Sequence, residues 1–560
     1  MTKKLASVEL MQPDERVWRT HSFGDVEIYF FGYALVLQNV LGEIGDAFEE
    51  QSRARFETAI QLALTRLDGH FALIARQRKR YMMAVDRVRS TPLFFSMSDE
   101  RLVLGAHAPS VTEKTGQHGV DPVAAACIAM SGYTVGTDTL HPALFQLAPG
   151  ECLVVDNGVV TRTSYHQWRP WTTSATATSR THASMQECTL SVLDKVKRSA
   201  DGRRLAIALS AGLDSRVIAS GLAHLGGCDV TCYAYGLPGN YEARASKAIA
   251  DKLGLRWHFI PLTRKRQRAF IWSEVAEEYL TFADSRAATP VLNDLSATIN
   301  LLEAGYIDAD TLILNGNSGD FISGMHIVDS LRGVKSAQTL TSMRNDVVQA
   351  LISKHFRLWD VLATTARDTM VAERLRREID HMTEGNAPDP NGRHGLYEAM
   401  EFRDRQSKFV VARQRIYDYL GLGWRLPLWD NDYLDYWEHV PLKQKANQAL
   451  YKDALKSADW GGVWGQQWWP ERRVSPNWMR LGVRPLMKGI LAPFGRTRWH
   501  EFERRFLYYW MDLLALHGAL PYAEVAMDTR GARHFIAWHT QRYLLRVGRG
   551  YDGQEMTRKT

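Results

Sequence analysis

Cysteine is scarce in this sequence. There are five cysteines among 560 residues, scattered and odd in number. They do not form a disulfide framework, and they are typical of a protein in a reducing cytosol. No run of 18 apolar residues occurs, and no apolar segment follows the charged start at residues 1–5. We therefore expect a cytoplasmic protein with neither a secretion signal nor a transmembrane segment.

Several common motifs are also missing. The sequence has no Gly-Lys dipeptide, which excludes the P-loop of kinases and GTPases, and it has no His-Glu-x-x-His, Cys-x-x-Cys or strand-linked Gly-x-Gly-x-x-Gly. The nearest approach to metal-ligand spacing is His224, Cys228 and Cys232. Two glycines at 226–227 would break a helix between them, so we expect Cys232 to be a packed thiol in a strand and not a zinc ligand.

Positive charge is concentrated at the carboxyl end. The chain has 69 Lys and Arg against 62 Asp and Glu, a net charge of +7, and residues 457–560 alone hold 16 against 9. The same segment holds 8 of the 17 tryptophans. Since the first 456 residues are neutral overall, the charge does not indicate that the whole chain binds nucleic acid. We expect residues 457–560 to form a separate basic extension.

Tryptophan and arginine are interleaved in this extension. They include Trp460, Trp464, Trp468, Trp469, Trp478 and Trp499, with Arg472, Arg473, Arg480, Arg484, Arg496 and Arg498. We predict a helical extension folded onto the rest of the chain, with buried tryptophans and solvated arginines. The alternative is a contact surface for a protein partner, a second copy of the chain, an acidic substrate, a membrane surface or single-stranded nucleic acid.

Residues 1–165 consist mostly of short strand patterns. The predicted strands are 26–31, 71–74 and 81–85, and the predicted helices are 56–67 and 122–130. Residues 166–183 are rich in serine and threonine without apolar periodicity, which is typical of a linker.

From residue 184 onward the pattern changes to helices that alternate with short apolar strands. The predicted strands are 205–209, 230–235 and 312–314. This alternation predicts a parallel α/β sheet covered by helices on both faces. A loop at 384–392 precedes a mostly helical part, and we assign residues 184–456 to one domain.

The most informative segment is the turn at residues 210–215, Ser-Ala-Gly-Leu-Asp-Ser. It joins a buried strand to a helix that we expect to begin at Arg216. Such a turn points backbone N–H groups and the positive end of the helix at one spot, which suits phosphate, and the Ser210 and Ser215 hydroxyls can add donors. Asp214 alone would repel phosphate, so it fits a ligand of a Mg²⁺ ion that bridges the phosphates.

Two other interpretations of this turn stay open. Small residues between a strand and a helix occur in many sheets for packing alone. Residues 208–212, Ala-Leu-Ser-Ala-Gly, also come close to the Gly-x-Ser-x-Gly elbow of α/β-hydrolases, in which Ser210 would be the nucleophile of an esterase. The esterase hypothesis leaves Asp214 and Ser215 without a role.

A second polar turn follows the strand at 312–314. Its sequence at 315–320 is Asn-Gly-Asn-Ser-Gly-Asp. In an open parallel sheet, ligands bind at the carboxyl ends of the strands. Two such turns, one carrying Asp214 and the other ending at Asp320, could hold one Mg²⁺–pyrophosphate unit from both sides.

Several segments of the chain carry a resemblance to a known family. The turn at 210–215 resembles the pyrophosphate loop of the N-type ATP pyrophosphatases, and the chain from about residue 20 to residue 456 resembles the asparagine synthetase family. Its other matching segments are 234–239 (Ala-Tyr-Gly-Leu-Pro-Gly), 285–290 (Ser-Arg-Ala-Ala-Thr-Pro), 425–430 (Arg-Leu-Pro-Leu-Trp-Asp) and 441–452. Segments 67–72, 86–94 and 147–151 are similar to landmarks of that family's glutaminase domain.

The resemblance implies both a fold and a set of site residues. The fold is α/β overall: an amino-terminal α+β sandwich of the class II glutaminase (Ntn) type over 1–165, then a parallel-sheet ATP-pyrophosphatase domain with a largely helical carboxyl-terminal part. The implied cofactors are ATP and Mg²⁺. The implied Mg²⁺ ligands are Asp214 and Asp320, and the implied ATP-binding residues are Ser210, Gly212, Ser215 and Gly316 with Tyr235 and Gly236 on the adenine side. The implied catalytic residues are Lys452, for charge on the activated intermediate, and Arg286, for the acid substrate.

The sequence departs from the family at three positions. The family glutaminase uses a cysteine directly after the initiator methionine, but Thr2 stands there and the first cysteine is Cys127. A threonine can act as a nucleophile, yet the residues after it do not resemble the family start, so we expect no glutaminase activity. Asn317 replaces a glutamate of asparagine synthetases, and an amide cannot take a proton as a carboxylate does. Ala211 replaces a usual glycine.

The resemblance therefore implies an ATP-dependent amide-forming ligase. It would adenylate a small-molecule or peptide carboxylate, release pyrophosphate and transfer the acyl group to ammonia or another amine. Three alternatives are kept: an asparagine synthase proper that uses free ammonia, a catalytically silent binding scaffold, and the α/β-hydrolase-like esterase.

Overall fold

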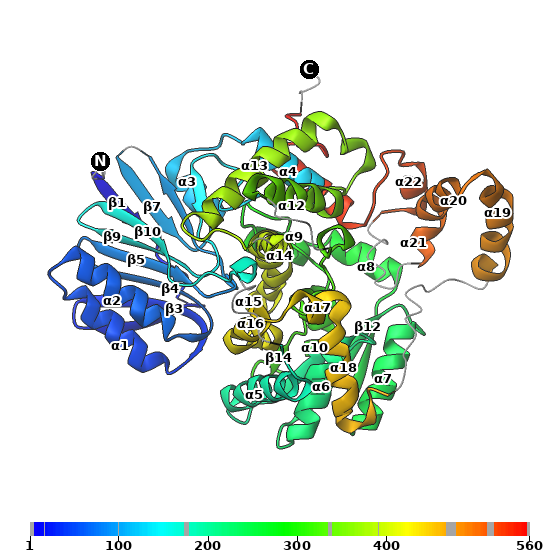
Figure 1. Cartoon of the computed structure of the whole chain (residues 1–560), viewed down its shortest axis with the longest axis horizontal. Coiled ribbons are helices and arrows are strands. Elements are labelled where there is room, and N and C mark those ends of the chain that lie inside the picture. Colours follow the sequence, from blue (N-terminus) through cyan, green and yellow to red (C-terminus); the bar gives the residue numbers. More distant parts are fainter. Residues whose placement is uncertain are drawn as a thin grey trace.

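The computed structural model describes residues 5–15, 17–98, 100–172, 179–333, 339–389, 391–465, 478–511 and 520–556. Two sheets form the amino-terminal region. A third, parallel sheet is formed by strands from the middle of the sequence, between residues 205 and 425, and has helices around it (Figure 1). The mixed α/β fold expected from the sequence is confirmed. Several predicted features lie outside the described residues, namely Thr2, residues 173–178 of the linker, Trp468, Trp469, Arg472 and Arg473.

The amino-terminal region is a sandwich of two sheets. The first has the order β1 (Ser7–Leu10), β7 (Arg101–Gly105), β6 (Phe94–Met97), β8 (Leu144–Gln146). The second has the order β10 (Val159–Ser164), β9 (Glu151–Asp156), β5 (Arg80–Val85), β4 (Asp68–Gln77), β3 (Val26–Leu35), β2 (Arg19–Phe23), and its neighbours are antiparallel throughout. The strands predicted at 26–31, 71–74 and 81–85 are parts of β3, β4 and β5.

The alternating direction of side chains along each strand produces the layers of this sandwich. In β3, Tyr29 and Phe31 pack in the core between the two sheets, whereas Ile28 and Phe30 pack against helices on the other face. Side chains point to opposite faces at every second residue of a strand, which explains this division. The helices are α1 (Leu37–Phe48) and α2 (Arg53–Thr65) on the six-stranded sheet and α3 (Ala108–Thr115) on the four-stranded sheet.

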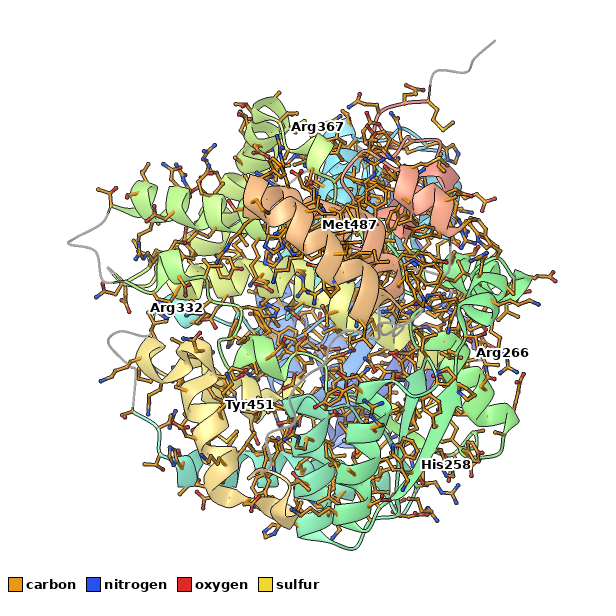
Figure 2. All side chains as sticks on the ribbon, turned by 90° about the vertical axis from the view of Figure 1, so that its right-hand side faces the viewer. His258, Arg266, Arg332, Arg367, Tyr451 and Met487 are labelled. Carbon is orange, nitrogen blue, oxygen red and sulfur yellow. The ribbon has the colours of Figure 1, made fainter. Side chains whose placement is uncertain are left out.

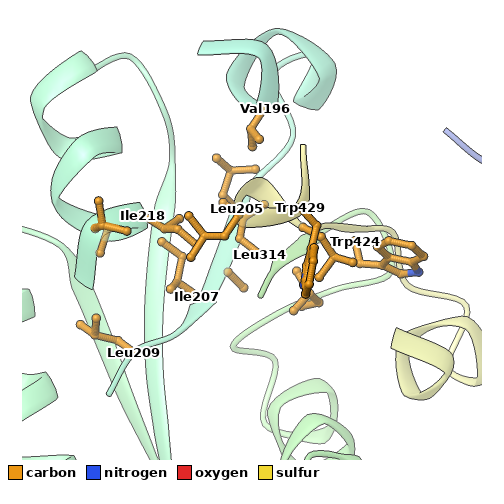
Figure 3. Packing of buried hydrophobic residues seen from close by; sticks show 14 of the residues in the cluster. Val196, Leu205, Ile207, Leu209, Ile218, Leu314, Trp424 and Trp429 are labelled. Atoms are coloured by element: carbon orange, nitrogen blue, oxygen red, sulfur yellow. The ribbon is translucent and has the colours of Figure 1, made fainter. Parts of the chain in front are cut away.

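The central sheet is parallel throughout. Its order is β13 (Arg256–Pro261), β12 (Val230–Gly236), β11 (Leu205–Ala208), β14 (Leu312–Leu314), β15 (Trp424–Arg425). The three strands predicted here are confirmed as β11, β12 and β14, and Cys232 is buried in β12 as expected. Figure 3 shows Leu205 and Ile207 of β11 packed among side chains of the flanking helices and of the segment that holds Trp424 and Trp429.

Helices cover both faces of this sheet. They include α5 (His182–Ala200), α6 (Leu213–Leu225), α7 (Tyr241–Leu253), α10 (Leu295–Glu303), α16 (Asn431–Glu438) and α18 (Ala449–Ala458). Helix α6 begins at Leu213 and not at Arg216 as expected, because Gly212 takes the extended N-cap conformation and the next residue already enters the helix. This correction places Asp214 and Ser215 in the first helical turn.

A second core is helical and joins distant parts of the chain. It is formed by α4 (Pro122–Ser131), α12 (Leu340–His355), α13 (Thr365–Thr383), α14 (Arg393–Glu401) and α23 (Ile536–Arg546). Helix α4 is apolar on nearly all sides, as expected of a fully buried helix. The part that follows the loop at 384–392 is mostly helical, as expected, and the two-residue β15 is the one strand among its described elements. Helices α12 and α13 of this core precede the loop.

The segment at 425–430 connects the amino-terminal sandwich to the central sheet. The Arg425 guanidinium lies 3.6 Å from the centre of the Tyr33 ring. Lys195 Nζ lies 3.0 Å from Asp430, 2.7 Å from Asp68 of β4 and 2.7 Å from Asp432. This part of the family resemblance therefore maps to an interdomain contact.

The extension contains the helices α19 (Arg484–Leu491), α20 (Arg496–Phe502), α21 (Tyr508–Met511), α22 (Tyr522–Met527) and α23. Its tryptophans are buried at Trp460, Trp464 and Trp499, as expected, but Trp478 is 55% exposed. Trp464 Nε1 donates to Ser220 Oγ of α6 at 3.1 Å, so the start of the extension packs on the central domain.

Within the described residues, no helix combines the length and hydropathy needed to cross a bilayer.

Candidate active site

A cavity of about 720 Å³ lies at the carboxyl ends of β11, β12 and β14. Most of the residues that the sequence singled out line it. These are Ser210, Gly212, Asp214, Ser215, Tyr235, Gly316, Asp320 and Lys452. Gly236 and Arg286 are not among its lining residues.

The turn at 210–215 is held by its own serines. Ser210 N–H donates to Ser215 Oγ at 2.9 Å, and Gly212 N–H donates to Ser210 Oγ at 3.0 Å. The first N–H groups of α6 have no acceptor within the helix, and the Gly212 N-cap supplies no side-chain acceptor. The turn thus presents the positive end of α6 to the cavity, which is an arrangement that binds anions.

The two turns touch each other through glycine. A Cβ atom at Gly316 would lie 2.8 Å from Ser215 N, and one at Gly319 would lie 2.6 Å from Asp214 Oδ1. The backbone N–H of Asp320 donates to Asp214 Oδ2 at 3.0 Å. Only residues without a side chain permit this approach, so the glycines are what brings the two acids together.

Electrostatics at the acid pair favour a cation. Burial, and then the negative charge of Asp320, raise the pKa of Asp214 to about 8. A divalent ion beside the two carboxylates would relieve this repulsion. The described residues offer no group of three or more His, Cys, Asp or Glu side chains able to hold a metal on their own. Two carboxylates beside an anion site are the donor set that suits Mg²⁺ shared with phosphate.

Lys452 reaches the cavity from α18. Its Nζ donates to the carbonyl of Asn447 at 2.8 Å, and its side chain is exposed. Asn447 and Gln448 both have positive φ, 58° and 62°, and Gln448 Nε2 donates to Ser323 Oγ at 2.8 Å. This strained bend sets the start of α18 and therefore the direction from which Lys452 approaches.

Two other predicted residues have different surroundings. The Tyr235 hydroxyl donates to Asp294, which also lines the cavity. Arg286 adopts a positive φ of 53° and lies 3.2 Å from Asp284. Its carbonyl accepts from Leu140 N–H at 2.6 Å, so Arg286 borders the amino-terminal region and is not brought together with the two turns.

Sequence reasoning missed a buried polar network beside Asp320. Glu401 at the end of α14 is fully buried and bonds to His326 Nδ1, and its other oxygen lies 3.1 Å from His355 Nε2. His326 Nε2 lies 3.3 Å from Asp320. Burial lowers the pKa of His326, but the charges of Glu401 and Asp320 outweigh this and raise it to about 9. The contact between positions 326 and 401 arises only in the folded chain, and no local pattern indicates it.

Two cations that line the cavity were also not predicted from the sequence. Arg405 and Arg413 come from the distorted helical segment at 402–414. Gln406 from the same segment accepts from Ser318 Oγ at 2.7 Å and donates to Glu401 at 3.0 Å. This segment therefore positions the second turn as well as supplying positive charge.

The remaining residues of the turns have defined contacts. The backbone N–H of Asn317 donates to Asn315 Oδ1 at 3.0 Å, and its side chain lines the cavity. Glu242 of α7 accepts from Ala211 N–H at 2.8 Å. Ser210 Oγ lies 3.1 Å from Ser215 Oγ and accepts from Gly212 N–H, and no histidine is among its hydrogen-bond partners in the described residues. The triad that an esterase requires is therefore not assembled on Ser210.

The first cysteine of the chain is unsuited to catalysis. Cys127 lies in α4 and is 1% exposed, and burial raises the pKa of its thiol to about 12. Nucleophilic cysteines are thiolates in partly exposed, electropositive places.

In the amino-terminal sandwich, Asp86 accepts from Phe71 N–H and Val88 N–H at 2.9 and 2.7 Å, which holds the turn at 86–90 together.

Comparison with known families agrees with these features. Residues 191–459 match the asparagine synthase family, and residues 54–166 match the glutamine amidotransferase domain family. Both turns, the acid pair and Lys452 fall within the first match. The two matched domains stand in the order found in an asparagine synthetase-family protein, with the glutaminase-like domain first, as the sequence resemblance implied.

Similarity to solved structures is more distant. One is glutamine phosphoribosylpyrophosphate amidotransferase from B. subtilis complexed with ADP and GMP, with 11% identity, a TM-score of 0.17, and coverage of 53% of this chain and 62% of that chain. Another is an allosteric regulatory enzyme of purine biosynthesis, with 12% identity, a TM-score of 0.18, and coverage of 59% and 58%. The chain spans about three fifths of the length of these two structures. A search of curated proteins gave no significant match.

Proposed function

We propose that the chain is an ATP-dependent ligase that forms an amide bond by adenylating a carboxylate. The observation that carries this proposal is the contact between the two turns. It places a helix N-terminus and the Asp214–Asp320 pair in one cavity at the carboxyl end of a parallel sheet. An anion site next to a pair of acids fits a Mg²⁺–pyrophosphate unit, and neither feature alone would do so.

The residues present fit both cofactors. Asp214 and Asp320 would hold Mg²⁺, and the first turn of α6 with Ser210 and Ser215 would bind the pyrophosphate part of ATP. Tyr235 would lie on the adenine side. When bound, ATP with Mg²⁺ would supply the activated phosphoryl group that a substrate carboxylate attacks, with pyrophosphate as leaving group.

The chain's own contribution is positioning and charge. Lys452, Arg405 and Arg413 line the same cavity and would offset the negative charge of the triphosphate and of the activated acid. His326, anchored by Glu401, would orient the Asp320 carboxylate. Holding the carboxylate and the phosphate in line lowers the barrier without a covalent enzyme intermediate.

Our proposal for the source of the amine rests on the two candidate nucleophiles of the amino-terminal domain. Cys127 is buried and protonated, and position 2 is Thr2, so we propose that this domain does not release ammonia from glutamine. Asn317 cannot serve as a general base. The second substrate would therefore be free ammonia or another amine, and the first a small-molecule or peptide carboxylate. Five free cysteines fit a reaction in a reducing cytosol.

The direct test is ATP–pyrophosphate exchange with a panel of amino acids, sugar acids and peptides in the presence of Mg²⁺. We expect exchange with at least one acid, and its loss in Asp214→Asn and Asp320→Asn. The matched control is Asp310→Asn, an exposed aspartate between α10 and β14. No exchange with any acid, together with no binding of Mg²⁺–ATP by calorimetry, would favour the silent scaffold instead. Release of glutamate from glutamine would refute the proposal for the first domain.

A further inference from the structure

Residues 478–511, which we call the basic hairpin, lie outside the region that matches the asparagine synthase family. The hairpin comprises a turn of π-helix at Met479–Val483 followed by α19, α20 and α21. In Figure 1, α19 and α20 lie at the edge of the molecule opposite the amino-terminal sheets. Figure 2 is viewed from that edge and shows Met487 of α19 in front.

The hairpin has its own small core and is attached to the body of the protein. Met479, Trp499 and Leu507 are buried in this core. Arg504 pairs with Asp360 at 2.5 Å, and Arg264 of the central domain donates to the carbonyls of residues 509 and 510 at 3.2 Å. The position of the hairpin on the molecule is therefore fixed by polar contacts.

The outer side of the hairpin is apolar and exposed. Leu481 is 71% exposed, Leu486 63%, Ile490 49% and Phe494 65%, and no residue of α19 is buried. With Trp478, these make up five of the 17 exposed large apolar side chains in the described part of the chain. Leu486, Ile490 and Phe494 follow one another at intervals of four. An apolar cluster of this kind marks a surface that contacts something other than water.

Cations occur in the same segment as this cluster, and the segment has no acids. Residues 478–500 contain five Arg and Lys and no Asp or Glu. Lys488, Arg496 and Arg498 are exposed, and none of them forms an ion pair with a described carboxylate. Arg484, in contrast, lies 2.8 Å from Glu503. Three cations of the segment are thus available to an external anion, and the Arg498 guanidinium lies 5.9 Å from the centre of the Phe494 ring.

We propose that the basic hairpin docks on an anionic membrane surface. Leu486, Ile490 and Phe494 would enter the boundary between headgroups and acyl chains, and Lys488, Arg496 and Arg498 would contact lipid phosphates. Trp478, an amphipathic ring at the margin of the cluster, suits the same interface. The hairpin would hold the proposed ligase at the cytosolic leaflet without crossing the bilayer.

The composition favours lipid over other anionic partners. Single-stranded nucleic acid is bound by stacking on successive aromatic rings. Three of the five exposed side chains of the cluster are Leu or Ile, and only Trp478 and Phe494 are aromatic. A protein partner would need an apolar groove bordered by acids that matches an edge of the molecule. A lipid surface adapts to the cluster and supplies acyl chains and phosphates at the same depth.

The experiment measures binding of the full-length protein to vesicles by sedimentation. One set contains phosphatidylcholine alone and the other contains added phosphatidylglycerol. We expect binding to the anionic vesicles only. The charge variant Lys488→Gln/Arg496→Gln/Arg498→Gln should bind on the order of a hundredfold more weakly, at about fivefold for each cation. The apolar variant Leu486→Ser/Ile490→Ser/Phe494→Ser should lose binding.

Matched controls are Arg198→Gln on α5 and Leu62→Ser on α2, whose side chains are 64% and 63% exposed. Both should bind as the unmodified chain does, and all variants should keep the same circular dichroism spectrum. The proposal is overturned if anionic vesicles are not bound, if neutral vesicles are bound equally well, or if the hairpin variants behave like the controls. Dissociation of a dimer by the apolar variant, without any vesicle binding, would assign the cluster to a protein interface instead.

Discussion

Gly316 is the position where the second turn lies against the backbone of the first, so alanine at this position tests whether their contact builds the site. A Cβ atom there would lie 2.8 Å from Ser215 N and 3.0 Å from the carbonyl carbon of Asp214. Both neighbours are backbone atoms, which cannot rotate away. The φ of Gly316 is not in the left-handed region, so alanine suits the local backbone and the effect is steric.

The magnitude follows from the packing. Adding a methyl group to a filled site costs about 1–3 kcal/mol. We expect the strain to be relieved by separation of the turns, because they border the cavity and not the core. Separation would move Asp320 away from Asp214 and weaken binding of Mg²⁺–ATP by roughly 5- to 150-fold. Calorimetry with Mg²⁺–ATP, together with ATP–pyrophosphate exchange, measures this loss.

The control is Gly119→Ala, because a Cβ atom at Gly119 would have no heavy atom within 4 Å and its φ is also outside the left-handed region. This variant should bind and exchange as the unmodified chain does. If Gly316→Ala bound Mg²⁺–ATP with unchanged affinity while remaining folded, the contact between the turns would not be what forms the site.

Three further predictions follow from other parts of the molecule. Lys195→Ala removes the cation shared by Asp68, Asp430 and Asp432, and it should lower the free energy of unfolding by about 1.5–3 kcal/mol, as measured in urea; an unchanged midpoint would contradict the role of this contact. The raised pKa of His326 gives stability that is present below about pH 6.5 and lost as the pH rises through about 9. In metal-free buffer, His326→Gln should therefore lower the free energy of unfolding, relative to the unmodified chain, more at pH 6 than at pH 10. A loss of the same size at both pH values would refute the stabilising role of protonated His326. Cys127 should not react with a thiol reagent in the native protein at pH 8, and Cys127→Ala should leave exchange unchanged.

Much of the central sheet was predictable because its signals are local. The apolar runs that became β11, β12 and β14 are continuous, and the turns after β11 and β14 consist of small and polar residues in sequence. The start of α6 was misplaced by three residues, since Gly212 serves as its N-cap and nothing in the composition marks this. Lys452 was found only through the family resemblance.

The remainder of the site depends on tertiary contacts. His326 and Glu401 meet although 75 residues separate them, and Arg405 reaches the cavity from a distorted helix whose course cannot be read from periodicity. Arg286 lies in a segment that resembles the family, yet the fold places it against Leu140. Trp478 was expected to be buried with the other tryptophans, but the core of the basic hairpin is too small to cover it.

The central claim is that this cavity cleaves ATP between the α and β phosphates to activate a carboxylate. The most direct measurement is to identify the nucleotide products when the protein turns over Mg²⁺–ATP with an acid that supports exchange and an excess of ammonia. We predict AMP and pyrophosphate in equal amounts, formed together with the amide and absent in Asp214→Asn. Formation of ADP and phosphate, or unchanged turnover in that variant, would contradict the account.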